Sequence, residues 1–231
     1  MLLESQGKSL LIDCGSDIRF SLYDQGLDYD DIDALFISHL HGDHAGGVEW
    51  LSFQRKFASK REKPDLYGAR VIVDDLWKKV LSGSLSSLEN EQADLSTYFK
   101  VHPIENTPPS FDWEGIHFEL IKTLHCMSND QPMPSYGLMI ESAGHKVLIS
   151  GDIQFHPEKM MRYYEEADLI FHDCETITPP TSVHAPYTDL ASLPEKIKNK
   201  MWLYHYNDGS LPPALLDGFK GFVRRGQRFD V

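Results

Sequence analysis

The chain has 231 residues, 41% hydrophobic and 25% charged, which is typical of a globular protein and excludes a disordered or fibrous one. Its 35 acidic residues outnumber 22 basic ones, which gives a formal net charge of −13. This charge argues against binding of long nucleic acid, because protein surfaces that bind nucleic acid are strongly basic. No stretch approaches the ~20 apolar residues of a membrane helix, and the N-terminus lacks signal-peptide features. Three scattered cysteines indicate neither a disulfide framework nor a thiolate zinc site. We therefore expect a cytoplasmic protein without membrane contact, built as one domain over residues 1–231.

Apolar runs and turn residues predict the secondary structure in chain order. A hairpin is expected over residues 1–12, a buried strand within 31–38, and a helix over 45–57. Further strands are expected at residues 69–73, 118–124, 136–140, 146–150, 169–171 and 201–204, and a further helix at 157–166. The polar segment 82–96 is predicted to be a loop or a mobile lid. Strands alternate with helices, which favours an α/β fold.

The strongest signal is a histidine-rich motif, S-H-L-H-G-D-H, at the end of the strand predicted within residues 31–38. Residues two apart in an extended segment point the same way, so His39 and His41 can bind one metal ion. The following turn redirects Asp43 and His44 toward a second ion. Polar surface loops rarely have this spacing, and the motif therefore predicts a metal site.

Three later strands are each followed by a residue that can bind a metal. These residues are His125, Asp152 and His205. The carboxyl ends of strands are where sites gather in α/β folds. Each residue alone has an ordinary explanation, as a structural histidine or a turn aspartate. Their coincidence with the histidine motif favours one shared metal centre.

With these residues the sequence resembles the metallo-β-lactamase superfamily of dinuclear metal hydrolases. The resemblance implies an αββα sandwich and two divalent ions. It also implies the ligands, with His39, His41 and His125 on one ion, Asp43, His44 and His205 on the other, and Asp152 bridging. Histidines without a thiolate suit zinc, with manganese as the alternative. An aspartate at position 152, in place of a cysteine, is unlike the penicillin-hydrolysing lactamases and leaves phosphodiesterases, nucleases, lactonases and thioesterases.

Two further stretches resemble the paired motifs of the ribonuclease Z-like branch, H-D-C-E-T from His172 and V-H-A around His184. In that branch a glutamate orients a histidine that protonates the leaving oxygen, which implies these roles for Glu175 and His184. A carboxylate bonded to an imidazole raises its basicity and fixes its tautomer. Asp43 is the third candidate catalytic residue. As structural alternatives, Glu175 would cap a turn and His184 would be an incidental loop residue, and Ala185 stands where a serine is frequent.

Longer stretches are most similar to compact phage and bacterial enzymes that degrade cyclic mononucleotides, including the anti-Pycsar phosphodiesterases. The stretches are LLIDCGSDI (10–18), ISHLHGDHAGGVEW (37–50), ADLIFHDCET (167–176), KMWLYHY (200–206) and GFVRRGQRF (221–229). The similarity implies hydrolysis of a small phosphodiester, foremost a cyclic mononucleotide, to a linear monophosphate, and a role in evading anti-phage defence. Family members usually begin with one more strand, so we expect that strand to be missing before Met1.

Other functions stay open on the sequence alone. They are an RNA 3′-processing nuclease, a lactonase or thioesterase of the same fold, and a non-catalytic module that binds a nucleotide or a metal. Two divalent ions would change the formal charge from −13 to −9, and their charge is local, so a small anionic phosphodiester can bind where a long polyanion cannot. Residues 82–96 and 102–113 could close over a neighbour's site, which makes a homodimer a further hypothesis.

Overall fold

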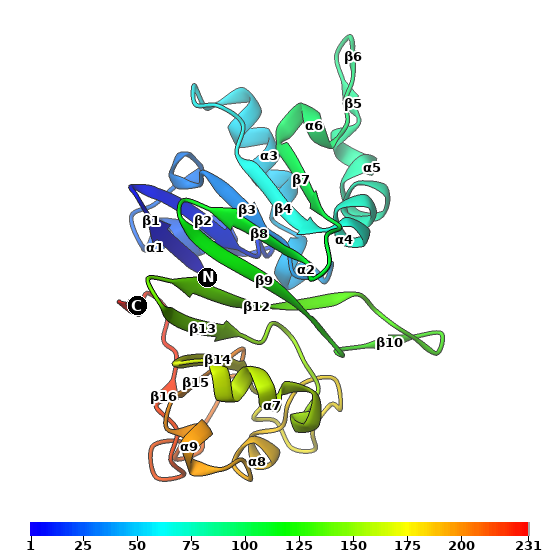
Figure 1. Ribbon diagram of the computed structural model, residues 1–231. Coiled ribbons are helices and arrows are strands. Elements are labelled where there is room, and N and C mark those ends of the chain that lie inside the picture. The colour runs from blue at the N-terminus through cyan, green and yellow to red at the C-terminus, as the bar shows by residue number, and fades with distance from the viewer. Residues whose placement is uncertain (231) are drawn as a thin grey trace. The chain divides into compact units, whose positions relative to one another are not determined.

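Two main sheets organise the protein, one in each half of the chain (Figure 1). The computed structural model describes residues 1–230. These residues form two units, the first over Met1–Pro109 and the second beginning at Ser110. Within the described residues, no helix is both long and apolar enough to cross a membrane. The expectation of one domain over residues 1–231 stays a prediction.

The first unit is built on a five-stranded sheet in the order β1-β2-β3-β4-β7. β1 and β2 form an antiparallel hairpin, and β2, β3, β4 and β7 run parallel to one another. All residues of the central strand β3 are buried, as expected for a parallel strand inside a sheet. The strand bounds are β1 Leu2–Ser5, β2 Lys8–Ile12, β3 Ala34–Phe36, β4 Asp65–Ala69 and β7 Lys100–Ile104.

Helices and short turns connect the strands of the first unit. The longest, α3, buries Val48, Leu51, Ser52 and Arg55, a spacing that places one stripe of the helix against the core. The bounds are α1 Ile18–Asp24, η1 Tyr29–Asp31, α2 Gly42–Ala45, α3 Val48–Phe57, α4 Arg70–Asp75, η2 Leu76–Leu81, α5 Ser82–Leu85 and α6 Leu95–Tyr98, with a small hairpin of β5 Ser87–Leu88 and β6 Glu91–Gln92.

The second unit is built on a seven-stranded sheet in the order β16-β15-β14-β13-β12-β9-β8. Strands β8, β9, β12 and β13 pair antiparallel, whereas β13, β14, β15 and β16 run parallel. The bounds are β8 Ser110–Trp113, β9 Ile116–Thr123, β10 Met127–Ser128, β11 Gln131–Pro132, β12 Ser135–Ser142, β13 His145–Ile149, α7 Pro157–Glu166, β14 Leu169–Asp173, α8 Tyr187–Leu190, α9 Glu195–Lys198, β15 Met201–Tyr204 and β16 Gly221–Phe222.

The core of the second unit lies where helix α7 packs on the parallel strands. Met160 and Tyr164 of α7 share one buried cluster with Leu148 of β13, Ile170 of β14 and Met201 of β15. Because β13, β14 and β15 are parallel, their carboxyl ends meet at one edge of the sheet. Asp152, Asp173 and His205 lie at or just beyond these strand ends.

Most predicted elements are confirmed, including the hairpin over 1–12 and the helix over 157–166. Two predictions are wrong. Residues 69–73 are not a strand, since β4 ends at Ala69 and α4 begins at Arg70; a short apolar run suits the buried face of either element. Residues 82–96 are not a featureless loop, because they form α5, the β5–β6 hairpin and the start of α6, with Leu85 and Leu95 buried.

Candidate metal centre

The first unit carries four of the predicted ligands on the segment that follows β3. His41 is the N-cap residue of α2, and its carbonyl accepts hydrogen bonds from the backbone of His44 and Ala45, which turns the chain. His39 Nε2 and His41 Nδ1 are 3.1 Å apart. His44 Nε2 lies 3.6 Å from Asp43 Oδ2. The structure therefore brings His39 to His41 and Asp43 to His44, and we call these four residues the N-terminal cluster.

Asp13, directly after β2, holds the N-terminal cluster in place. Its Oδ1 accepts a hydrogen bond from Ser38 N at 2.8 Å, and its Oδ2 accepts from Ser38 Oγ and His44 Nδ1, each at 2.7 Å. A carboxylate on one ring nitrogen fixes the tautomer of a histidine and presents the other nitrogen, here Nε2, to a metal. Asp13 was not among the predicted site residues, although it directly follows a predicted strand, just as the predicted ligands of the second unit do.

Two glycines directly after α2 lie too close to neighbouring backbone to carry a side chain. A Cβ on Gly46 would lie 2.5 Å from the Gly42 carbonyl oxygen, and a Cβ on Gly47 would lie 2.3 Å from the Gly15 carbonyl oxygen. Neither backbone can yield without moving the loop that carries the clustered side chains. The same pair of glycines separates α2 from α3, so the helix predicted over 45–57 begins only at Val48, and Ala45 is instead the last residue of α2.

The second unit carries the remaining predicted ligands near the carboxyl ends of its strands. His125 follows β9, Asp152 follows β13, His205 follows β15, and Asp173 is the last residue of β14. Ligand atoms of Asp152, Asp173, His184 and His205 all lie within 4.8 Å of one another. His125 Nε2 lies 3.6 Å from Asp152 Oδ2. We call these five residues the C-terminal cluster.

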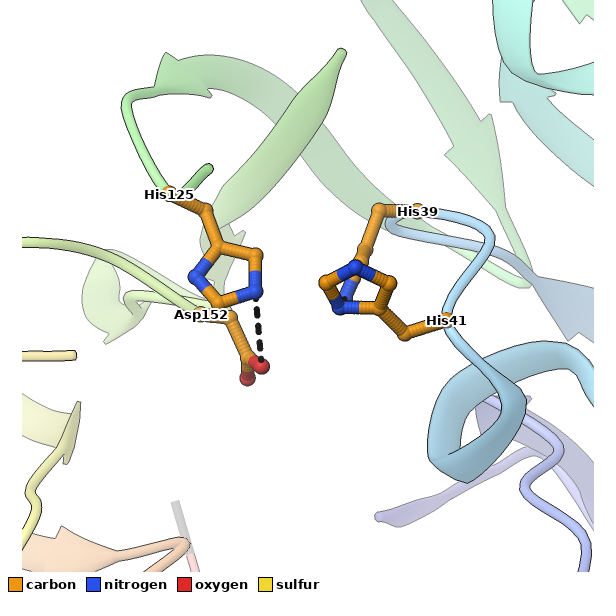
Figure 2. A group of neighbouring side chains, drawn as sticks. All are labelled: His39, His41, His125 and Asp152. Atoms are coloured by element: carbon orange, nitrogen blue, oxygen red, sulfur yellow. Dashed lines mark hydrogen bonds and ion pairs between the residues drawn. The ribbon is translucent and has the colours of Figure 1, made fainter. Parts of the chain in front are cut away.

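His125 is oriented as metal-binding histidines commonly are. Its Nδ1 donates to the Val183 carbonyl oxygen at 2.8 Å, so Nε2 is the nitrogen that faces Asp152. Figure 2 shows this contact as a dashed line and also draws His39 and His41 of the first unit. His125 and Asp152 are each 1% exposed.

The spacing of these atoms fits a divalent ion. At 3.6 Å, the contacts from His125 to Asp152 and from His44 to Asp43 are too long for hydrogen bonds. Two ligand atoms, each 2.0–2.2 Å from a tetrahedral ion, stand about 3.4 Å apart. Imidazole and carboxylate are also the donor types that zinc and manganese accept. Residues of both clusters therefore suit metal binding.

His184 lies against a buried carboxylate, which belongs to Asp173. His184 Nδ1 donates to Asp173 Oδ2 at 2.8 Å. Glu175, predicted to orient His184, instead accepts from Thr181 N at 3.0 Å and Thr181 Oγ1 at 2.6 Å. The predicted contact between Glu175 and His184 is therefore wrong. β14 continues to Asp173, two residues beyond its expected end, and it is the Asp173 carboxylate that contacts His184.

Glu175 acts on the loop that carries His184 and not on the imidazole. Its backbone N–H donates to the Ala185 carbonyl, and its own carbonyl accepts from Tyr187 N, both at 2.9 Å. Together with the Thr181 contacts, these bonds close the loop on itself. Glu175 thus supports the position of His184 through the backbone.

The contact between His184 and Asp173 shifts both protonation equilibria. Burial lowers the pKa of His184, but the hydrogen bond and charge of Asp173 outweigh it, and the net pKa is raised above its ordinary value. Burial raises the pKa of Asp173, but hydrogen bonds from His184 and His205 outweigh it and lower the pKa to about 2. The pair therefore favours an imidazolium beside a carboxylate. His205 Nδ1 is the second imidazole nitrogen near this carboxylate, 3.3 Å from Asp173 Oδ1.

Comparison with protein families gives one match over nearly the whole chain, the family "Anti-Pycsar protein Apyc1", over residues 1–229. The chain belongs to the anti-Pycsar Apyc1 family. An Apyc1 protein of Paenibacillus harenae is 36% identical over 90% of this chain and 82% of its own length. Another, of Paenibacillus sp. (strain J14), is 37% identical over 90% of this chain and 81% of its own.

Solved structures similar to this Apyc1 family member confirm the expected fold. The metallo-β-lactamase fold protein YhfI from Bacillus subtilis has a TM-score of 0.73 and 19% identity, over 98% of this chain and 89% of its own. A Zn²⁺-bound PqqB from Methylobacterium extorquens has a TM-score of 0.61 and 15% identity, over 89% and 75%. The α/β metallo-β-lactamase fold that the resemblance implies is therefore confirmed.

Proposed function

We propose that the protein is a dinuclear metal-dependent phosphodiesterase that hydrolyses cyclic mononucleotides to linear monophosphates. The N-terminal and C-terminal clusters together would hold the two ions. In this assignment His39, His41 and His125 would hold one ion, Asp43, His44 and His205 would hold the other, and Asp152 would be a ligand that both ions share. The family membership and the donor geometry within each cluster support this proposal.

The donor set favours zinc, with manganese as the alternative. It contains five histidines and two carboxylates, and the ligand assignment includes no thiolate. Bound divalent ions lower the pKa of water and offset the negative charge of a phosphoryl group. The Asp13 and Val183 contacts orient His44 and His125 for such ions in the way outer hydrogen bonds do at known sites.

The contact that best supports hydrolysis of a phosphodiester is the one between His184 and Asp173. Because Nδ1 is engaged by Asp173, the other nitrogen, Nε2, is the one that can give a proton to a substrate. Water attacks phosphorus and gives up one proton to solvent, the bond from phosphorus to the ribose oxygen breaks, and His184 Nε2 transfers its proton to that departing oxygen. The Asp43 carboxylate, 61% exposed, accepts a hydrogen bond from the attacking water.

The proposed substrate is a small phosphodiester and not a long nucleic acid. With 35 acidic residues against 22 basic ones, the chain offers few cations for a polyanion. The relatives are named anti-Pycsar proteins, and for this chain we propose a corresponding role in removing cyclic mononucleotide signals of anti-phage defence. We also propose a cytoplasmic location and a homodimer, the latter to be tested by sedimentation.

A substrate panel on one metal-analysed preparation tests this function. The panel contains cyclic mononucleotides, an aryl phosphodiester, a short RNA, a lactone and a thioester. We expect loss of the cyclic nucleotides and formation of linear monophosphates. Intact cyclic nucleotides beside a hydrolysed lactone or thioester would refute the proposal. Cleavage of the RNA alone would favour an RNA 3′-processing nuclease, and tight nucleotide binding without product would favour a non-catalytic module.

A matched pair of variants tests the proposed acid. His184→Ala should keep its metal and lose about 10²- to 10⁴-fold in kcat on substrates with a poor leaving group, because that step needs a proton donor. The control is His117→Ala, since the exposed side chain of His117 makes a contact of the same type and length, 2.8 Å, with the exposed carboxylate of Asp112 in the same unit. Equal rates in both variants would exclude His184 as the acid.

A further inference from the structure

The last residue of β14 extends beyond the neighbouring strand. The ladder between β13 and β14 ends with the pair Ile149 and Phe171, whereas β14 continues to Asp173. On the side of β14 that faces β13, the backbone groups of Asp173 form hydrogen bonds with side chains and not with a neighbouring strand. Its N–H donates to Ser150 Oγ at 2.8 Å, and its carbonyl oxygen accepts from His172 Nδ1 at 2.6 Å. The peptide that carries the Asp173 carboxylate is thus fixed by side chains.

The direction of the hydrogen bonds around His172 follows from its chemistry. A carbonyl oxygen can only accept, so Nδ1 of His172 carries the proton. Burial lowers the pKa of His172, and the neutral ring has a single N–H. Its Nε2 must therefore accept, and the Tyr164 hydroxyl donates to it at 2.6 Å. Tyr164, His172 and the Asp173 carbonyl form one chain of donors and acceptors.

The packing of this core does not by itself require the polar groups of Tyr164 and His172. Tyr164 belongs to a buried core cluster whose other members include Met160, Ile170 and Met201, all of them apolar. Both ring nitrogens of His172 are engaged although the residue is 0% exposed. Side chains at neighbouring positions of a strand point to opposite faces, so His172 reaches Tyr164 while the Asp173 side chain reaches His184.

We propose that Tyr164 and His172 are positioning residues for the proton donor. They fix the Asp173 peptide where β14 outruns β13 and so aim the Asp173 carboxylate at His184 Nδ1. The inference rests on the proposed function in one respect, the role of His184 as the acid. Neither residue contacts the substrate in this proposal; they act through Asp173.

Tyr164→Phe and Tyr98→Phe make a matched pair for the test. Tyr98 donates its hydroxyl to the Leu85 carbonyl oxygen at 2.6 Å, and both tyrosines are 1% exposed. Each variant loses one buried hydrogen bond, so both should have a lower Tm. Only Tyr164→Phe should lose about 10- to 100-fold in kcat on a cyclic nucleotide, with KM unchanged and with little loss on an aryl phosphodiester that has a good leaving group. Equal kcat in the two variants, or equal losses on the two substrates, would overturn the proposal.

Two substitutions of His172 separate positioning from packing. His172→Asn places an amide N–H near the position of Nδ1 and can still donate to the Asp173 carbonyl, whereas His172→Leu cannot. We expect the asparagine variant to retain clearly more kcat than the leucine variant at similar Tm. Equal kcat in both would show that the donor at this position has no positioning role.

A spectroscopic measurement tests the proposal without any hydrolysis. The His184 Nδ1 proton, bonded to a carboxylate, should give a downfield proton resonance that is identified by its absence in His184→Ala. We expect this resonance to shift or broaden in Tyr164→Phe and to stay unchanged in Tyr98→Phe. An unchanged resonance in both overturns the positioning role. If no phosphodiester is hydrolysed by the wild type, the proposed function fails, whereas this measurement still decides the positioning.

Discussion

Replacement of Asp13 by asparagine should weaken metal binding at the N-terminal cluster without removing any proposed ligand. Asp13 Oδ2 accepts from both Ser38 Oγ and His44 Nδ1 at 2.7 Å. Asparagine keeps the shape, and its oxygen can still accept from Ser38 N in the place of Oδ1. Its amide group would then stand in the place of Oδ2 and donate where a donor is already present. His44 Nδ1 would have to accept, and its proton would move to Nε2, the atom assigned to the metal.

The expected size of this effect follows from the contacts that are lost. Outer hydrogen-bond partners of metal-binding histidines are typically worth about 10- to 100-fold in metal affinity, which corresponds to roughly 1.4–2.7 kcal/mol. Two short bonds to one carboxylate oxygen, one of them from the ring itself, favour the upper part of that range. We therefore expect Asp13→Asn to lose close to 100-fold in affinity for one of two ions.

Competition with a chromophoric chelator measures this loss, together with metal stoichiometry. The control is Asp33→Asn. Asp33 also accepts a hydrogen bond from the backbone of a distant segment, Ser9 N at 3.0 Å, but among the described residues it has no hydrogen bond to a proposed histidine ligand. The control should keep two ions per chain at wild-type affinity. Wild-type affinity in Asp13→Asn, or an equal loss in both variants, would refute the tautomer argument.

Three further predictions concern stability. Gly137→Ala should lower the free energy of unfolding, measured in urea, by about 1–3 kcal/mol, because its Cβ would lie 2.5 Å from the Ser150 carbonyl oxygen. The control Gly83→Ala should leave this free energy unchanged, because no atom lies within 4 Å of the added Cβ. Similar values for the two variants would contradict the steric explanation. The free energy of unfolding should fall as the pH drops below about 6.5, by up to ~1.4 kcal/mol per pH unit, since burial lowers the pKa of His172 and only the unfolded chain takes up that proton. This slope should be smaller in His172→Leu, and parallel curves would speak against it. Removal of metal by a chelator should lower the Tm, and zinc or manganese should restore it; an unchanged Tm would argue against bound ions.

Local sequence determined the parts of the candidate site that depend on neighbours in the chain. His39, His41, Asp43 and His44 lie within six residues, and a strand end followed by one turn is enough to pair them. The helix over 157–166 was also predictable, because Pro157 suits a first helical position. His125, Asp152 and His205 followed from the rule that polar residues at strand ends gather at one edge.

Tertiary structure decided the contacts between distant segments. Asp13 meets Ser38 and His44 across 25 and 31 residues, and no local pattern specifies that pairing. Asp173 was missed because the end of β14 is set by its neighbour β15, which pairs with it up to Tyr204, and not by the apolar run of β14 itself. The length of a strand depends on where its partners stop supplying hydrogen bonds. The sequence by itself therefore determined the proposed metal ligands, and only the assembled sheet decided that Asp173 is the carboxylate facing His184.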